Sequence, residues 1–319
     1  MATYAAKLDR VSPSNMVFNL NRCGLPALNT VGKIFYVAPA TSAIRPRWIE
    51  TQENVYTTLL AAYTQTVTGR NDVIVLSPDS HALAATLTIA KDRVHIVGAD
   101  VAGRHFGQRA RISFANGIAE TLKAAVIVTG DGCSMTGVKI INNNTDTDVK
   151  WGLSDEGEYN IYQNCSFENW GQAAVSVAGE VNLASDCVTF KDCTFGSTSV
   201  TQTGALHPNL NITSITDGYL ENCLFYRKAG ATTNIFVYGT GAQIVTRSLI
   251  LKSCVFFNPI NASTMAAAVH FATDLTSGVV LLDQCVSAGD ITIQATTSKH
   301  VYVSGAVPTG ASSGVAVTA

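Results

Sequence analysis

The chain has 319 residues, of which 47% are hydrophobic and only 14% are charged, and its formal net charge at pH 7 is −2. This near-neutral balance gives no electrostatic basis for binding nucleic acid or a membrane surface, so we expect neither as a partner. No run approaches the ~20 apolar residues of a membrane span, and the N-terminus lacks the apolar run typical of a signal peptide. The eight cysteines include no CxxC pair, so we expect free thiols in a reducing cytoplasm, with no metal and no cofactor.

Residues 1–33 form the first predicted segment, an extended N-terminal arm. Proline and glycine, among them Pro13, Gly24 and Pro26, interrupt every candidate helix or strand in it. Its apolar residues are too numerous for a solvated tail, so we expect the arm to lie on another protein. The residues assigned to that contact are Met16, Val17, Phe18, Leu20 and Leu25.

Residues 34–70 are predicted to hold a strand and a capping helix. The strand is Ile34-Phe35-Tyr36-Val37, and the helix covers residues 51–68, where apolar side chains recur every four residues until Gly69 ends the pattern. An open solenoid exposes the apolar interior of its first coil. The position of this amphipathic helix, just before the repeats, therefore indicates a cap.

Six cysteines recur at intervals of 28 to 32 residues, each in a similar short phrase such as Asn164-Cys165-Ser166-Phe167. A fixed period of this length is the signature of a repeat architecture. A small or polar residue precedes each cysteine and suits a sharp corner, after which cysteine turns inward as a small apolar group. We interpret the column as packing rather than chemistry. Its members are Cys133, Cys165, Cys193, Cys223, Cys254 and Cys285.

One coil per repeat, with each strand pairing to the coils before and after it, predicts an all-β parallel β-helix over residues 71–306. Early coils contain strands at residues 72–76, 85–89 and 94–98. We expect the long insertions between the cysteine phrases to form loops on one side of the solenoid, where contacts are often carried. They cover residues 141–159, 196–215, 226–247 and 257–268, and residues 307–319 form a C-terminal tail.

The order of these features resembles a known family. A helix, then Asp72-Val-Ile-Val-Leu-Ser-Pro, Ala-Thr-Leu-Thr-Ile, Val-His-Ile-Val-Gly and the Asn-Cys-x-Phe coils are similar to right-handed parallel β-helix proteins of the pectin-lyase-like type. The resemblance covers residues 34–306 and implies that fold, which hosts lyases, hydrolases, esterases, tail spikes and capsid decoration proteins.

Within that family, the apolar arm, the low charge and the signal-free start are most similar to bacteriophage capsid decoration, or cement, proteins. The resemblance implies a structural virion protein, not an enzyme, that binds and stabilises the shell of the major capsid protein. It would be made in the host cytoplasm and lie on the capsid exterior. Viral β-helices resemble one another in often forming trimers, and closed symmetry covers exposed apolar surface, so we expect a homotrimer.

The alternative is a tail-spike-like protein that binds or degrades polysaccharide. A glycosidase needs two carboxylates on either side of the scissile bond, and one acidic stretch offers candidates. The partner motifs of polysaccharide-active β-helices are missing, with no Asp-Asp pair and no Gly-His-Gly, so we favour a solvated loop. The runner-up catalytic residues are Asp146, Asp148, Asp155 and Glu156.

The densest basic stretch is a candidate contact loop. Its guanidinium groups suit phosphate, an acidic sugar or an acidic protein face, although a plain surface loop is the favoured interpretation. The residues are Arg104, His105, Arg109 and Arg111.

Overall fold

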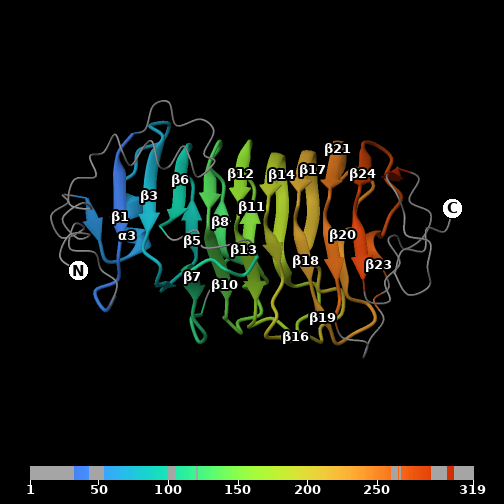
Figure 1. Cartoon of the computed structure of the whole chain (residues 1–319), viewed down its shortest axis with the longest axis horizontal. Coiled ribbons are helices and arrows are strands. Elements are labelled where there is room, and N and C mark those ends of the chain that lie inside the picture. The colour runs from blue at the N-terminus through green and yellow to red at the C-terminus, as the bar shows by residue number, and fades with distance from the viewer. Residues whose placement is uncertain are drawn as a thin grey trace, which may run out of the picture.

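The computed structural model describes residues 32–42, 54–99, 105–119, 121–259, 265, 267–288 and 300–304. In these ranges almost every regular element is a strand, and each strand pairs in parallel with strands from the neighbouring coils. Figure 1 shows the coils side by side along one long axis, from the N-terminal to the C-terminal end. The predicted all-β parallel β-helix is therefore confirmed.

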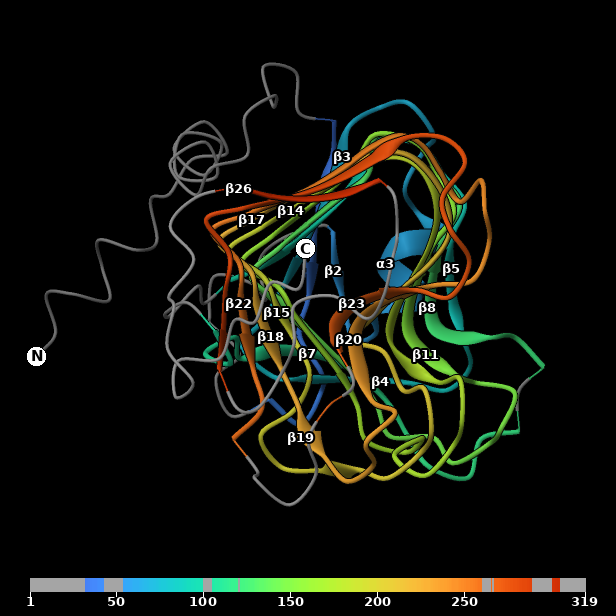
Figure 2. The same ribbon diagram turned by 90° about the vertical axis from the view of Figure 1, so that its right-hand side faces the viewer.

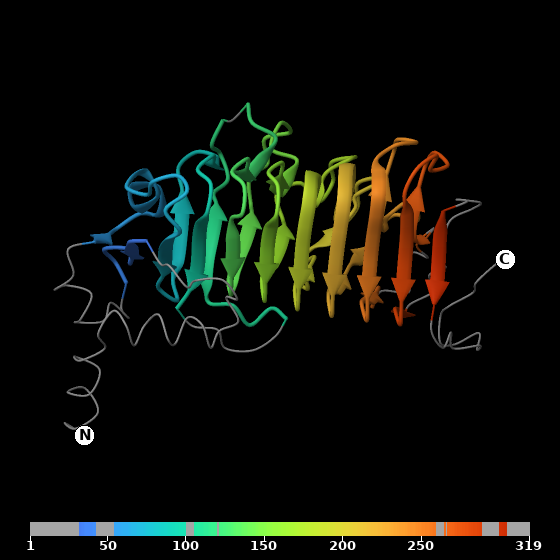
Figure 3. The same cartoon turned by 90° about the horizontal axis from the view of Figure 1, so that it is seen from above.

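The strands stack in three rows, which we call the first, second and third rows. The first row consists, in spatial order, of β2 (Val55–Tyr56), β1 (Ile34–Val37), β3 (Asp72–Leu76), β6 (Val94–Gly98), β9 (Ser134–Thr136), β12 (Asn160–Gln163), β14 (Gly179–Lys191), β17 (Leu210–Glu221), β21 (Val245–Lys252), β24 (Val279–Asp283) and β26 (Val301–Ser304). In Figure 3 these strands lie side by side along the long axis of the molecule.

The other two rows complete each coil. The second row consists of β5 (Leu87–Ile89), β8 (Ala124–Val128), β11 (Trp151–Asp155), the first halves of β14 and β17, β20 (Ile235–Gly239) and β23 (Ala267–Phe271). The third row consists of β4 (Ser80–Leu83), β7 (Ala110–Phe114), β10 (Val138–Asn142), β13 (Ser166–Asn169), β15 (Thr194–Phe195), β18 (Leu224–Tyr226), β22 (Val255–Phe257) and β25 (Val286–Ala288). A short pair, β16 (Thr201–Gln202) and β19 (Lys228–Ala229), joins neighbouring loops. Viewed along the long axis, successive coils overlie one another around a shared interior (Figure 2).

The corner between the first and third rows lies at the residue before the cysteine in five coils and at Gly137, between β9 and β10, in another. All six of these residues have a positive φ, between 50° and 66°, which is the left-handed region. Asn, Asp and Gly reach that region at low cost, which explains the polar or small residue at this position. The residues are Gly137, Asn164, Asp192, Asn222, Ser253 and Gln284.

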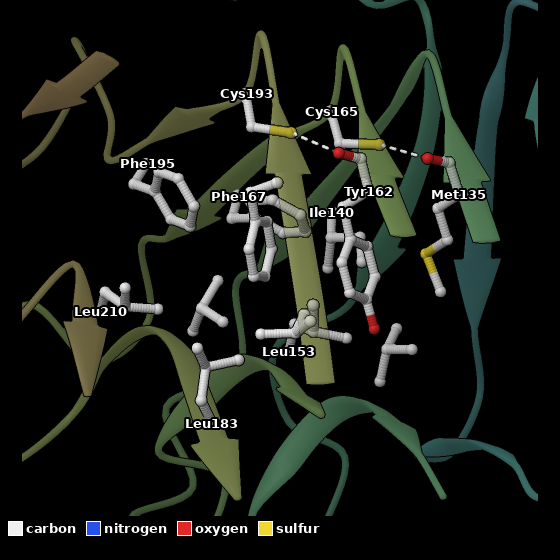
Figure 4. Packing of buried hydrophobic residues seen from close by; sticks show 14 of the residues in the cluster. Met135, Ile140, Leu153, Tyr162, Cys165, Phe167, Leu183, Cys193, Phe195 and Leu210 are labelled. Carbon is white, nitrogen blue, oxygen red and sulfur yellow. Dashed lines mark hydrogen bonds between the residues drawn. The ribbon is translucent and has the colours of Figure 1, made fainter. Parts of the chain in front are cut away.

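After the corner, five of the six cysteines, from Cys165 to Cys285, form one buried column. The prediction was wrong for Cys133, which comes just before the first-row strand β9, level with Asn160, and leaves the column position of its coil to Val138. Each thiol donates a hydrogen bond to a backbone carbonyl of the preceding coil, such as Cys165 Sγ to the Met135 carbonyl and Cys193 Sγ to the Tyr162 carbonyl, both at 3.3 Å (Figure 4). All six thiols are free and buried. The position thus takes a side chain that is small enough for the stack and can donate to a carbonyl in the preceding coil.

Phenylalanine two residues after the cysteine forms a second interior column. The ring centroids of Phe195 and Phe225 lie 4.7 Å apart and those of Phe225 and Phe256 lie 4.9 Å apart, in stacked geometry. Phe167 extends the column by one coil. Each buried ring contributes about 1.5–3 kcal/mol, and each aromatic pair adds about 0.5–1.5 kcal/mol.

The N-terminal helix is much shorter than predicted. It is α3 (Leu59–Thr64), not residues 51–68, and Thr58 caps it by accepting a 3.2 Å hydrogen bond from Ala61 N. Val55 and Tyr56 instead pair with β1, because the edge of the first row satisfies their backbone groups. Leu59, Ala62 and Tyr63 are buried against the first coils, so this single helical face covers part of the interior.

The expected loops are also partly wrong. The second-row strands β11 and β20 and the start of β17 fall within the insertions predicted at residues 141–159, 226–247 and 196–215, and β23 begins within the insertion predicted at residues 257–268. Their outward side chains include Ser154, Asn182 and Asn211, residue types that are poor strand formers. They are satisfied by one another, since Asn182 Nδ2 donates to Ser154 Oγ at 3.1 Å and Asn211 Nδ2 to Asn182 Oδ1 at 2.8 Å.

Candidate functional site

The four runner-up catalytic carboxylates do not form a pair. Asp146 and Asp148 lie in the turn before β11, where Asp148 N donates to Asp146 Oδ1 at 3.1 Å, whereas Asp155 ends that strand. The five residues of β11 separate the two groups by about 16 Å of extended strand. Carboxylates that act on one glycosidic bond stand roughly 5–10 Å apart. Neither Asp146 nor Asp148 can therefore share a substrate bond with Asp155.

Asp155 and Glu156 also face in different directions. The Asp155 carboxylate is fully buried and accepts a 2.7 Å hydrogen bond from Asn160 Nδ2, and burial raises its pKa to about 7. Glu156 lies nearer the surface, where it forms an ion pair with Lys123 at 3.0 Å. An interior carboxylate that no substrate can reach is a structural group, so this pair provides no catalytic site.

The basic stretch lies over the outer face of the third row. His105 Nδ1 lies 2.8 Å from Thr194 Oγ1, and the Phe106 ring packs edge-on against Tyr226 with centroids 5.7 Å apart. Arg109 and Arg111 are exposed, Arg111 on β7. Arg104 lies outside the described residues, as do the arm residues Met16, Val17, Phe18, Leu20 and Leu25, so the predicted capsid contacts stay predictions.

A groove of about 350 Å³ lies on the outer face of the first row, where sequence analysis placed no site. We call it the tyrosine groove. Its floor and walls come from four successive coils, on β12, β14, β17 and β21 and the residues next to them. The lining residues are Tyr159, Asn160, Ile161, Cys187, Val188, Thr189, Asp217, Gly218, Tyr219, Ser248 and Ile250.

Strand alternation explains why these side chains meet. Along β14, β17 and β21, the positions of Val188, Gly218 and Leu249 are in register and face the interior, so the residues on either side of them point outward. One outward column in the groove is Ile161, Thr189, Tyr219 and Ile250, and the next is Cys187, Asp217 and Ser248. Tyr159, the residue before β12, also lines the groove. Parallel in-register pairing therefore turns single outward residues into continuous rows.

Aromatic and apolar surface dominates the tyrosine groove. Tyr159 is 64% exposed and Ile161 is 37% exposed, while Tyr219 and Ile250 are half-buried. Grooves of this size and character are typical of binding sites, where apolar walls provide affinity and a few polar groups fix orientation. A tyrosine ring offers both a flat apolar face and a hydroxyl for hydrogen bonding.

Ion pairs border the tyrosine groove on both long sides. On one side, the Asp217 carboxylate accepts hydrogen bonds from Ser248 Oγ at 2.6 Å and from the Arg247 guanidinium. On the other side, Glu221 stands between two lysines, with Lys191 Nζ at 3.5 Å and Lys252 Nζ at 3.8 Å. All five charged groups that flank the groove are thus held in ion pairs, three cations with two carboxylates.

Within the described ranges, no group of three or more His, Cys, Asp or Glu side chains is placed to share a metal ion. No helix in the described part of the chain is long and apolar enough to cross a membrane.

Comparison with solved structures identifies proteins with the same architecture. A pectin methylesterase mutant in complex with a hexasaccharide has a TM-score of 0.55 at 13% identity, over 89% of this chain and 92% of that one. The pectin methylesterase PemA from Erwinia chrysanthemi scores 0.54 at 11% identity, over 90% and 93%. The pectate lyase Pel9A scores 0.58 at 12% identity, over 90% and 79%. No family model matches the sequence, and no curated protein matches it.

These likenesses establish the pectin-lyase-like right-handed parallel β-helix as the fold of this chain. They also correct the prediction that the chain is not an enzyme, because the three proteins that share its fold are pectin methylesterases and a pectate lyase. At 11–13% identity the likeness extends to the fold alone, and no catalytic residue is carried over from those proteins.

Proposed function

We propose that this chain is a parallel β-helix that binds polysaccharide in the tyrosine groove. The observation that carries the proposal is the pair of accessible rings, Tyr159 and Tyr219, in a groove of about 350 Å³. Sugar rings present C–H faces that stack on tyrosine and hydroxyls that bond to polar side chains such as Asp217 and Ser248. The fold shared with a pectin methylesterase in complex with a hexasaccharide supports the choice of ligand class.

A binding assay with matched variants tests this proposal. Affinity electrophoresis through gels that contain polysaccharide should retard the protein, and Tyr219→Ala should weaken the retardation by about tenfold, since aromatic stacking is worth about 0.5–1.5 kcal/mol beyond burial. Tyr302→Ala is the control, because Tyr302 lies in the same outward column and is 54% exposed, yet lies outside the groove. Equal loss in both variants, or no retardation by any polysaccharide, would contradict the proposal.

Degradation at the same groove is measured separately. Degradation needs a carboxylate at the groove, and Asp217 is the acidic residue among the described lining residues. Its hydrogen bonds with Ser248 and Arg247 fix the orientation of its side chain. Release of shorter sugars from a retained polysaccharide, abolished by Asp217→Asn, would identify the chain as polysaccharide-degrading. Asp148→Asn, in the turn before β11, serves as the comparison.

The virion role predicted from sequence stays a prediction. It comprises binding to the major capsid protein, homotrimeric assembly and a location on the capsid exterior. A polysaccharide-binding β-helix also fits a tail-spike-like place on a virion, which was the alternative. Deleting residues 1–33 and measuring binding to purified capsids tests the decoration role directly, since full binding by the shortened chain would exclude the arm as the contact.

A further inference from the structure

We propose that the tyrosine groove takes an uncharged polysaccharide whose chain runs along the long axis of the coil stack, across the strands. This inference rests on the proposed function and adds the charge class and the direction of the ligand. Three features of the groove support it: the charges at its edges, the direction of its rows and the spacing of its two tyrosines.

The charges at the edges disfavour an acidic polysaccharide. The cations nearest the groove, Arg247, Lys191 and Lys252, are already engaged with the carboxylates of Asp217 and Glu221. A polyanion with a carboxylate on each sugar needs unpaired guanidinium or ammonium groups at successive subsites. Here three cations share two carboxylates, which leaves one excess positive charge for the whole groove rather than one at each subsite. Neutral hydroxyl groups, by contrast, can bond to both members of an ion pair.

The direction of the ligand follows from the rows. The groove crosses β12, β14, β17 and β21, which are successive in the first row, so it extends over about 14 Å at the usual strand separation. The outward column of Ile161, Thr189, Tyr219 and Ile250 runs without a break across these strands. The charged row of Lys191, Glu221 and Lys252 runs parallel to that column two residues further along each strand. An extended chain therefore fits between the rows when it crosses the strands.

The two tyrosines set the length of the ligand. Tyr159 belongs to the coil of β12 and Tyr219 to the coil of β17, two coils further on, which separates them by about 10 Å along the axis. A single sugar ring cannot contact both. Binding should therefore strengthen as the oligosaccharide becomes long enough to reach from one ring to the other.

The test compares oligosaccharides of equal length by isothermal titration calorimetry with the full chain. The probes are cellohexaose, xylohexaose, mannohexaose and the acidic hexagalacturonate, together with the disaccharide of each sugar. We expect at least one neutral hexasaccharide to bind about tenfold more tightly than its disaccharide, with an affinity that changes little between low and high salt. Tyr159→Ala and Tyr219→Ala should each weaken hexasaccharide binding by about tenfold, whereas Tyr302→Ala should not.

A charge variant sharpens the test. Glu221→Gln leaves Lys191 and Lys252 without their shared carboxylate, so this variant should acquire salt-sensitive binding of hexagalacturonate that the parent lacks. Tight, salt-sensitive binding of hexagalacturonate by the parent would overturn this inference while leaving the proposed function intact. Binding of none of the probes would overturn both. A dimer in solution that Tyr219→Ala dissociates, without any glycan binding, would assign the groove to a second copy of the chain and also overturn both.

Discussion

Asn160 Nδ2 donates a 2.7 Å hydrogen bond to Asp155 Oδ1 in the interior of the coil stack, where the end of β11 meets the start of β12. Gly157 N approaches the same oxygen at 3.4 Å. Even with these donors, burial outweighs hydrogen bonding and raises the pKa of Asp155 to about 7. The carboxyl is thus a buried group whose protonation is linked to folding.

We expect Asp155 to make the protein less stable as the pH rises from about 4 to about 7. The folded state holds the proton up to about pH 7, whereas the unfolded chain releases it near pH 4, so ionisation opposes folding across that window and its cost stays constant above it. Asp155→Asn removes the titration. Its unfolding free energy relative to the parent should rise by up to about 4 kcal/mol between pH 4 and pH 8. Urea unfolding at several pH values measures this, and a difference that stays flat would contradict it.

The cysteine column should behave as packing. Cys193 is fully buried and its thiol donates to the Tyr162 carbonyl at 3.3 Å, so Cys193→Ala should lower the unfolding free energy by about 1–2 kcal/mol through a small void and an unpaired carbonyl. Burial raises the pKa of the Cys165 thiol well above its usual value, so thiol reagents should not label that position in the folded protein. A mass measurement without reductant that finds the column paired in disulfides would refute this interpretation.

The parts of the fold that recur once per coil could be predicted from sequence. Asn164, Asp192 and Asn222 mark the corner because few residues adopt a positive φ, and Phe195 and Phe225 mark the interior because they are large and apolar. The second row was missed because its outward residues, such as Asn182, resemble loop residues until a neighbouring coil supplies their hydrogen bonds. Such pairing partners lie about thirty residues away and are invisible to local patterns.

The candidate site was missed for a related reason. The residue four before each cysteine of the buried column is outward-facing, and Ile161, Tyr219 and Ile250 stand there although an exposed strand position usually carries a polar group. That pattern was available in the sequence. Closeness along the chain made Asp148 and Asp155 catalytic candidates. In the structure β11 separates them, and the Asp155 side chain faces the interior.

Arg227 should be one of the most sensitive single positions. Its guanidinium has no exposed surface and donates to Glu180 Oε2 at 2.9 Å and Asn209 Oδ1 at 3.1 Å, and it lies 2.9 Å from His207 Nδ1. Arg227→Met leaves Glu180 buried without its cation, so we expect a loss of about 3–5 kcal/mol. Burial already raises the pKa of Glu180 to about 7 against the opposing charge of Arg227.

The double variant Arg227→Met with Glu180→Gln distinguishes charge from packing. If the unpaired carboxylate causes the loss, the double variant should recover a substantial part of the unfolding free energy, measured by chemical denaturation. Arg227→Lys should be almost as destabilised as Arg227→Met. One ammonium group cannot reproduce the planar set of N–H groups that the guanidinium directs at Glu180, Asn209 and His207. Additive losses in the double variant would mean that the site depends on packing volume instead.

Cys187 provides a chemical probe of the tyrosine groove. It lines the groove and is half-buried, whereas every other cysteine in the described part of the chain is buried, so a bulky maleimide should react at Cys187 in a chain that carries Cys23→Ser. The attached group would fill the space between Tyr159 and Tyr219, and polysaccharide binding should fall by about tenfold or more, because sugars could no longer stack on both rings. The matched control adds Cys187→Ser, which should bind polysaccharide equally well before and after the same treatment. Mass spectrometry confirms the labelled position, and undiminished binding by protein fully labelled at Cys187 would exclude this groove as the polysaccharide site.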